Sequence, residues 1–435
     1  MILTINLIMT FPDYLDREAV ISALGIKPAT LYAYVSRGLL RRVRSQDGRH
    51  SLYLREDVER LSARHRGVPR RDEAAASSMR WGAPVVSTGI TCIDAGGPTY
   101  RGRSAFELAR GDISFEAVVH LLLTGGWQPA MDAWPAIDTP DDVRRRLNTE
   151  LKALDAADLS KVLATAVLWL GMDARGQDEL SGASGQDARL IIQTLAGCFG
   201  GLATPGRFVE RKPDESIAAL VLRASGCSTS AQARSAVNQA LIVLADHELA
   251  TASFVSRITA STNSDLFCCV AAALCAHAGS SMAASAASID DKVFTPLTRR
   301  NQSEMLTLVR TRGTTLFGFN HPLYPRGDPR AEFLLTLAAS LPSADPKVQD
   351  LLAFLRLARE DGILPGIAVA LAVLARVLGL PSSGAPALWV LSRSAGWIAH
   401  ALEQRTQGFM LRPRAKFIST ADTVPLAATM PDLPA

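Results

Sequence analysis

Four stretches of the chain gather charged and polar side chains within apolar surroundings. They are Tyr100-Arg101-Gly102-Arg103, His247-Glu248, His321 to Arg330, and Arg393 with Arg412. A guanidinium group binds a carboxylate through two parallel hydrogen bonds, and an imidazole can polarise or protonate a carbonyl group. This combination of side chains predicts a site for a small carboxylate ligand.

The third stretch is the most informative. Its sequence, GFNHPLYPRGDPRAEFLL, places one histidine and two arginines in a loop that is rich in Pro and Gly, and Asp328-Pro329 is typical of a helix start. A rigid loop of this kind can present an imidazole and guanidinium groups to a ligand. The alternative is a surface turn with solvated arginines.

The fourth stretch predicts a helix followed by a loop. In SRSAGWIAHALEQ, the spacing i, i+7 and i+10 puts Arg393, His400 and Glu403 on one helical face, and Arg412 follows in the loop. His400 and Glu403 are better explained as a structural pair one turn apart than as catalytic groups.

The composition of the chain predicts that the elements positioning these residues are helices. Of its 435 residues 48% are hydrophobic and only 6% aromatic, with Ala and Leu in long runs, which favours an all-α protein of two or three domains. From Trp81 onward there is no sustained strand-type alternation and no glycine-rich loop after a strand. These absences argue against a nucleotide-binding α/β sheet.

The cysteines and the apolar stretches indicate neither a metal site nor a membrane partner. The six cysteines form no CxxC pair and have no histidine at ligand spacing, so buried free thiols are expected. The longest apolar stretch, Ile363 to Leu380, is interrupted by Pro365 and Arg376, and the N-terminus lacks the features of a signal peptide. We therefore expect a cytoplasmic protein.

Positive charge is concentrated in the first 70 or so residues. Between Arg37 and Arg71 there are eleven arginines and four acids, whereas the whole chain has a net charge of only +4. A basic segment of this kind suggests a polyanionic partner. The local pattern predicts helices over 17–24, 28–37 and 55–66, and strands over 41–43 and 51–54.

This pattern resembles the winged helix-turn-helix of MerR-type and excisionase-type proteins. LGIKPATLYAYVSRGLL followed by LYLREDVERL carries the resemblance, which covers residues 12–66, and residues 67–80 are expected to form a linker. The resemblance implies DNA binding through the second helix, by Lys27, Thr30, Tyr32, Tyr34 and Arg37. A module that docks on another protein, or a merely solvated arginine-rich face, is the alternative.

The remainder of the chain resembles citrate synthases. The segments that carry this resemblance, in family order, are TYRGRSAFELARGDISFEAVVHLLLTGGWQP, HELATASFVSRITAST, GFNHPLYPRGDPRA and SRSAGWIAHALEQ…RPRA. The resemblance implies an all-α fold with a large helical domain over 81–282 and 376–435 and a small one over 283–375. It also implies a homodimer.

The family condenses an acyl-CoA, usually acetyl-CoA, with oxaloacetate, and the resemblance assigns roles to five residues here. His247, His321, Arg330 and Arg393 would bind oxaloacetate, His321 would act on its ketone, and Arg412 would reach the site of the partner subunit. No cofactor is implied, and acyl-CoA would be a co-substrate.

Two side chains that the family uses for chemistry are replaced. The position of the histidine that stabilises the enol is Met282, and that of the aspartate that takes the methyl proton is Ala368. Met has no N–H to donate and Ala has no basic atom. The sequence therefore predicts a weak or inactive enzyme that acts as a dicarboxylate-binding regulator. The alternative is an active citrate or 2-methylcitrate synthase-like acyltransferase with another base. A shifted alignment would let Asp361 replace the aspartate or His277 the histidine.

Overall fold

The computed structural model describes residues 14–36, 39–44, 51–54, 57–58, 61, 86–155, 158–173, 183–279, 289, 293–312, 318–321, 323–343, 345, 347–381 and 383–413. The chain divides into two compact units, residues 1–87 with 303–313, and residues 88–302 with 314–435. Met282 and Arg37 lie outside the described residues.

The smaller unit contains two short helices and a three-stranded antiparallel sheet. The helices are α1 (Arg17–Leu24) and α2 (Pro28–Ser36), and the strands β1 (Tyr14–Asp16), β2 (Arg42–Arg44) and β3 (Ser51–Leu54) have the order β1-β3-β2. The Asp16 carboxylate accepts the Ala19 N–H at 2.8 Å, and Gly25 ends α1 with a φ of 62°. The helices and the β2-β3 pairing are as predicted, whereas β1 was not foreseen.

The core of the smaller unit is built from both helices, strand β3 and residues that follow them in the chain. It contains Val20, Leu24, Leu31, Leu40, Tyr53, Val58 and Leu61. Of the helix predicted over 55–66, only Asp57, Val58 and Leu61 are described, and all three are helical. Nearly all of α15 (Gln302–Arg312) is also assigned to this unit.

The larger unit is mostly helical. Its helices are α5 (Ala105–Arg110), α6 (Phe115–Thr124), α7 (Asp141–Lys152), α8 (Leu159–Asp173), α9 (Ala183–Gly197), α10 (Ile217–Ala224), α11 (Ala231–Leu244), α12 (Thr251–Ala260), α13 (Leu266–His277), α16 (Pro329–Ser340), α17 (Lys347–Glu360), α18 (Ile367–Val377) and α19 (Gly384–Gln407), with a short 3-10 helix η2 (Cys198–Leu202). Three short strands, β4 (Thr91–Asp94), β5 (Gly97–Tyr100) and β6 (Arg103–Ser104), form a second antiparallel sheet in the order β4-β5-β6.

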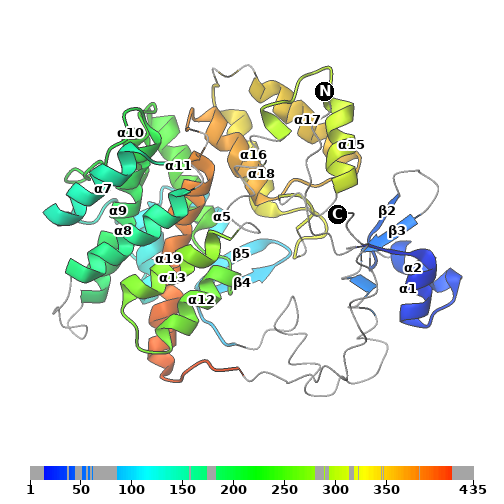
Figure 1. Ribbon diagram of the computed structural model, residues 1–435, viewed down its shortest axis with the longest axis horizontal. Coiled ribbons are helices and arrows are strands. Elements are labelled where there is room, and N and C mark those ends of the chain that lie inside the picture. Colours follow the sequence, from blue (N-terminus) through cyan, green and yellow to red (C-terminus); the bar gives the residue numbers. More distant parts are fainter. Residues whose placement is uncertain are drawn as a thin grey trace, which may run out of the picture. The chain divides into compact units, whose positions relative to one another are not determined.

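Helix α19 is the central helix of this unit. It contacts α6, α9, α11, α12, α13 and α18, and runs among the green and cyan helices in Figure 1. Most of its side chains are buried on all sides, as expected of a helix within a core. Side chains of α19 are therefore held on every side by other helices.

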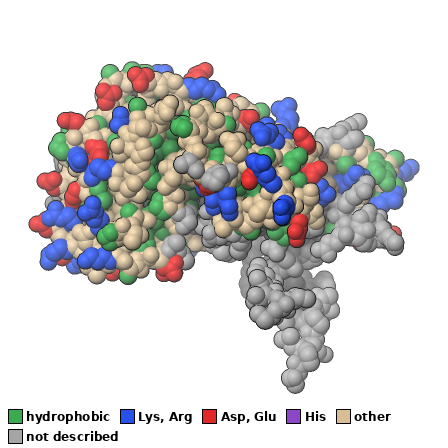
Figure 2. Space-filling view, turned by 90° about the horizontal axis from the view of Figure 1, so that it is seen from above, with side chains coloured by type: hydrophobic (Ala, Val, Ile, Leu, Met, Phe, Trp, Pro, Cys, Tyr) green, Lys and Arg blue, Asp and Glu red, His purple; other side chains and the backbone are tan. Residues whose placement is uncertain are grey.

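A second group of helices carries the loop that contains His321. Helix α18 packs against both α16 and α17, as Figure 1 shows. The apolar stretch that begins at Ile363 forms the buried α18, and among the described residues no helix is long and apolar enough to cross a membrane. On the face shown in Figure 2, Lys and Arg side chains of the larger unit lie among Asp and Glu side chains.

Two sequence predictions need correction here. The strands β4 to β6 were not predicted, because segments of two to four residues are too short to show an alternating pattern. Cysteines were expected to be buried, and Cys198 and Cys269 are, but Cys92 and Cys275 are exposed. An exposed thiol costs little free energy, so nothing requires these two side chains to lie in the core.

Candidate functional site

Four of the predicted site residues lie in one cluster that three segments build. His247 lies in the turn after α11, His321 in the loop before α16, Arg330 in the first turn of α16, and Arg393 in the middle of α19. The rings of His247 and His321 have their centroids 5.7 Å apart. The structure thus brings together segments separated by up to about 150 positions in the chain.

Tyr324 joins the two histidines and was not predicted as a site residue. Its hydroxyl lies 2.9 Å from Nε2 of His247, and its ring centroid is 5.3 Å from that of His321. Burial raises the pKa of Tyr324 to about 12, so the phenol remains protonated and can donate a hydrogen bond. The position of Tyr324 in the Pro-rich loop was the only signal in the sequence.

Arg330 is almost completely buried and is paired with Asp328. The Asp328 carboxylate accepts hydrogen bonds from Nε at 3.0 Å and from Nη2 at 2.7 Å, and it also caps α16 through the Arg330 backbone N–H. The guanidinium lies over the Tyr324 ring at 5.3 Å from its centroid. Burial opposes ionisation of both groups, but their mutual attraction more than offsets it: the pKa of Asp328 is lowered and the pKa of Arg330 is raised.

Arg393 is the second buried guanidinium. Its Nε donates to the Leu244 carbonyl at 3.0 Å, which ties α19 to the end of α11. In the part of the chain that the structure describes, no hydrogen bond occupies Nη1 of Arg330 or either Nη group of Arg393. Donors on two guanidinium groups are therefore available to a carboxylate ligand.

The two histidines are neutral at pH 7. Burial, together with the charges of Arg330 and Arg393, lowers the pKa of His247 well below 6.5, and burial with the charge of Arg330 lowers the pKa of His321 to about 4. Nδ1 of His321 accepts the backbone N–H of Leu323 at 3.2 Å, so the proton of the neutral ring is on Nε2. His321 can therefore donate a hydrogen bond from Nε2.

A buried polar layer lies next to His247, and sequence reasoning missed most of it. The Tyr100 hydroxyl is within 3.3 Å of the backbone carbonyls of Ile242, Val243 and Asp246. Asp246 is fully buried, and Oδ2 of its carboxylate lies 3.2 Å from Nε2 of His400. Adjacency to His247 in the chain was the available signal for Asp246.

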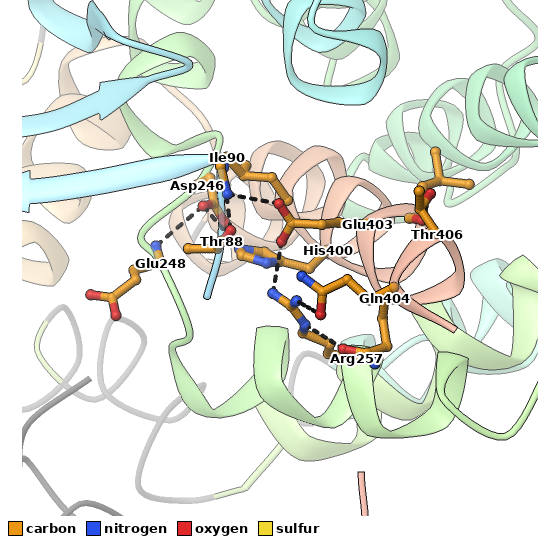
Figure 3. Close-up of polar contacts among 12 residues, drawn as sticks. Thr88, Ile90, Asp246, Glu248, Arg257, His400, Glu403, Gln404 and Thr406 are labelled. Carbon is orange, nitrogen blue, oxygen red and sulfur yellow. Dashed lines mark hydrogen bonds and ion pairs between the residues drawn. The ribbon is translucent and has the colours of Figure 1, made fainter. Parts of the chain in front are cut away.

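The structural pair predicted between His400 and Glu403 is wrong. His400 faces Asp246, whereas Glu403 accepts hydrogen bonds from Arg257 at 2.8 Å and from the Gly89 N–H at 2.7 Å. Figure 3 shows the two side chains directed to these separate partners. His400 and Glu403 thus both bind residues outside α19, because this helix is surrounded by other helices.

Ala368 lies beside the segment that leads to His321. Residues 318–320 run antiparallel to residues 364–366: the Asn320 N–H donates to the Leu364 carbonyl at 2.8 Å, and Phe319 bridges to Pro365. Gly318 has a φ of 108°, and a Cβ added to it would lie 3.5 Å from the Cβ of Ala368. The buried first turn of α18 therefore offers a methyl group next to the loop, and no basic atom at position 368.

Arg412 is exposed on the segment after α19. Its neighbour Leu411 donates its N–H to the Ser261 hydroxyl at 3.1 Å. No contact within the described residues joins Arg412 to the cluster, and its role at the site of a partner subunit stays a prediction. Asp361 is exposed in the turn after α17, and the buried His277 lies against the rings of Trp389 and Trp397.

The residues predicted to bind DNA lie in the smaller unit. Lys27 and Tyr32 are exposed, Thr30 is partly buried, and Tyr34 packs partly against the core. Arg41, one of the arginines of the basic segment, is held by the buried Asp57 at 2.8 Å from Nε and 3.0 Å from Nη2. Among the described residues of this set, Lys27 and Tyr32 are the exposed ones.

The chemistry available at the cluster is binding and hydrogen-bond donation. It has two guanidiniums, a phenol and an imidazole N–H, and groups of His, Cys, Asp and Glu that could hold a metal are absent from the described part of the chain. These donors suit an anionic ligand. A pocket of about 200 Å³ next to Asp328 is lined by Arg326, Glu332 and Arg359 among others, but by none of the four residues of the cluster.

Comparisons with known proteins match most of the chain. Residues 79–414 match the family model described as citrate synthase, C-terminal domain. The chain is 26% identical over 359 residues to the citrate synthase of Haloferax volcanii, an alignment that covers 76% of this chain and 91% of that protein. It is also 26% identical over 372 residues to the 2-methylcitrate synthase of Shewanella oneidensis, covering 77% and 92%.

The fold is also similar to solved structures. A ternary complex of carboxymethyl coenzyme A and oxaloacetate with citrate synthase from Thermoplasma acidophilum matches with a TM-score of 0.69 and 23% identity, covering 79% of this chain and 97% of that one. Citrate synthase from Thermotoga maritima matches with a TM-score of 0.65 and 22% identity, covering 79% and 95%.

Proposed function

Because the chain belongs to the citrate synthase family, we propose that it binds oxaloacetate or a related dicarboxylate and has little or no condensing activity. The ligand is bound by His247, His321, Arg330 and Arg393, and the protein acts as a dicarboxylate-binding regulator. The observation that carries the proposal is a contrast within the site. The side chains that can bind an anion are present, whereas the neighbouring Ala368 has no basic atom.

The guanidinium donors of the cluster support dicarboxylate binding. Arg330 has one nitrogen and Arg393 two that make no hydrogen bond within the described residues, and each guanidinium can engage one carboxylate. His321 supplies Nε2–H for the ketone oxygen between them. The Thermoplasma relative binds oxaloacetate together with a coenzyme A derivative, as the description of its complex states.

The replaced side chains support the loss of condensation. Condensation requires a base for the methyl proton and a donor for the enol oxygen, and each such group typically contributes a factor of about 10²–10⁴ to the rate. Ala368 supplies no base, and Met282 supplies no N–H. Both replacements affect the acyl-CoA half of the reaction and leave the dicarboxylate half intact.

The N-terminal residues 12–66 would report ligand binding to DNA or to a partner protein, through a winged helix-turn-helix with Lys27, Thr30, Tyr32, Tyr34 and Arg37. The larger unit would form a homodimer, in which Arg412 of each subunit reaches the neighbouring site. Closure between a large domain (81–282 and 376–435) and a small domain (283–375) is the two-state element that would couple the ligand to the N-terminal module.

The test is release of CoA from acetyl-CoA and from propionyl-CoA in the presence of oxaloacetate. We expect negligible turnover by the wild-type protein and a measurable gain for the double variant Met282→His with Ala368→Asp. Calorimetry should show that the wild type binds oxaloacetate, and that Arg330→Lys, which keeps the charge beside Asp328 but loses the guanidinium fork, binds it more weakly.

Robust turnover by the wild type would contradict this proposal and support an active citrate or 2-methylcitrate synthase-like enzyme with another base. Glu248 is the carboxylate that could act as the base in such an enzyme. It follows His247 directly, it is half-buried, and burial and the charge of Asp246 raise its pKa. In that case Glu248→Gln should abolish turnover without abolishing oxaloacetate binding.

A further inference from the structure

Next to His247 in the chain, the fully buried carboxylate of Asp246 contacts the fully buried imidazole of His400. Asp246, in the turn after α11, and His400, on α19, both have no solvent-exposed side-chain surface, and Oδ2 of Asp246 lies 3.2 Å from Nε2 of His400. Figure 3 shows this pair at the point where α19 passes the turn that carries His247. Neither side chain has a role in the binding described above.

The Asp246 carboxylate also holds the backbone on the far side of His247. Oδ2 accepts the N–H of Glu248 at 3.2 Å, and Glu248 has a left-handed φ of 55°. A non-glycine residue in this region carries a conformational cost that surrounding contacts must offset. The Glu248 side chain points away from Asp246 in Figure 3, so its backbone, not its carboxylate, is what Asp246 holds.

The backbone on the near side of His247 is held as well. The Tyr100 hydroxyl lies 3.3 Å from both the N and the O of Asp246. The Gly396 N–H donates to the Ala245 carbonyl at 3.1 Å, and a Cβ added to Gly396 would lie only 2.1 Å from Oδ1 of Asp246. The turn therefore sits directly on the backbone of α19, one helical turn before His400.

The charge of Asp246 is maintained by its neighbours. Burial would raise the pKa of the carboxyl group, but His400 and Arg393 more than offset this and lower it, so Asp246 is ionised. The same carboxylate favours the charged form of Arg393, whose pKa burial lowers. Asp246 is thus linked to two of the four ligand-binding groups, to His247 through the backbone and to Arg393 through charge.

We propose that the Asp246–His400 pair consists of positioning residues that fix the turn carrying His247, and so set the orientation of its imidazole in the dicarboxylate site. The inference rests on the proposed function for its effect on ligand affinity. The orientation of His247 in the ligand-free protein can be measured independently.

The chain offers a matched control on the same helix. Glu403 lies less than one turn from His400 and takes part in another largely buried ion pair, with Arg257. Within the described residues its hydrogen bonds go to Arg257 and Gly89, and not to Asp246 or the turn. Glu403→Gln should therefore lower the melting temperature without disturbing His247.

The test compares Asp246→Asn, His400→Gln and Glu403→Gln. We expect the first two variants to weaken oxaloacetate binding by about 10-fold or more, because each breaks a buried hydrogen bond between Asp246 and His400 next to the site. Glu403→Gln should bind with wild-type affinity. Asparagine has the shape of aspartate, so Asp246→Asn keeps the test open if His400→Gln does not fold.

The second readout is the NMR spectrum of the imidazole nitrogens, recorded on the ligand-free protein with nitrogen-labelled histidine. The chain has seven histidines to assign. Asp246→Asn should shift the His247 resonances and Glu403→Gln should leave them in place. A variant with a lowered melting temperature but unchanged His247 resonances would overturn the proposal. If the wild type binds no oxaloacetate, the proposed function fails, but shifted resonances in Asp246→Asn would still support the positioning role.

Discussion

The charges at the candidate site nearly balance before any ligand arrives. Arg330 is paired with Asp328, and Arg393 is opposed by Asp246, so two buried cations have two buried anions. A dicarboxylate adds two further negative charges to this neutral group. The groups able to compensate are the imidazoles of His247 and His321 and, in the proposed homodimer, the guanidinium of a neighbouring Arg412.

We therefore expect oxaloacetate binding to take up protons. In the free protein the pKa of His321 is lowered to about 4 and that of His247 is well below 6.5, so both are neutral at pH 7. A bound dianion offsets the arginine charges and raises both pKa values, so the complex holds more protons than the free protein. Affinity should then increase as the pH falls from 8 to 6, by up to about tenfold per pH unit for each proton.

Calorimetry in two buffers with different ionisation enthalpies measures this proton uptake directly. His321→Gln, which retains a hydrogen-bond donor, should bind oxaloacetate with less uptake than the wild type. Binding that is independent of pH over this range, or that releases protons, would contradict the charge argument.

At the residue scale the sequence identified groups by their type and missed those defined by their partners. His247, His321, Arg330 and Arg393 were predicted from side-chain chemistry and from the resemblance, and the structure brings them together. Asp328 was recognised only as a helix start, although its carboxylate also holds the Arg330 guanidinium. Such pairings depend on tertiary contacts, which a linear pattern does not contain.

At the scale of elements, local signals located helix ends well. Asp328 with Pro329, and Asp16 with Gly25, mark the ends of α16 and α1 because capping and left-handed turns depend on neighbouring residues. The sheet β4-β5-β6 was missed because its pairing depends on contacts between very short segments. The close approach of α19 to the His247 turn at Gly396 likewise has no local signature.

Helix α6 carries a buried acid whose titration should appear in the stability of the protein. The Glu116 carboxylate accepts the Ile217 N–H at 2.7 Å at the start of α10, and burial raises the pKa of Glu116 to about 7. Between pH 4.5 and 7 the folded state binds a proton that the unfolded state has lost. Stability therefore falls as the pH rises through this range, by a total of about 3 kcal/mol.

Glu116→Gln removes this cost because the amide is neutral and keeps an acceptor for Ile217. We expect a higher melting temperature than the wild type at pH 8 and little difference at pH 5, measured by thermal unfolding. The same difference at both pH values would show that Glu116 does not titrate as described.

At the scale of the whole molecule, the sequence predicted the citrate synthase family and an added N-terminal module. The family is shown by the comparisons, whereas the module remains a prediction. The family match spans residues 79–414. Several motifs in the family's order seldom occur by chance, which is why the sequence alone was sufficient to predict the family. The boundaries predicted at 66, 80 and 282 fall outside the described residues and remain predictions. The homodimer also remains a prediction, because the exposed Arg412 makes no contact with the cluster among the residues described in a single chain.

The predicted link between the two parts can be tested by DNA binding. Lys27 and Tyr32 are exposed on the smaller unit, where contacts to phosphates and bases are expected, whereas Arg41 is occupied by Asp57. In a mobility-shift assay with upstream DNA at near-physiological salt, we expect Lys27→Ala and Tyr32→Ala to weaken binding by about fivefold to tenfold. Lys161→Ala, which removes an exposed lysine of the larger unit, should bind like the wild type.

The ligand should change DNA affinity only through the dicarboxylate site. Oxaloacetate is therefore expected to shift the binding curve of the wild type but not that of Arg330→Lys, which should bind DNA normally in the absence of ligand. If Lys27→Ala binds DNA like the wild type, the module does not read DNA through this helix, and docking on a protein becomes the better explanation. If oxaloacetate binds in calorimetry but leaves the wild-type curve unchanged, the ligand does not regulate DNA binding and that form of the regulator proposal fails.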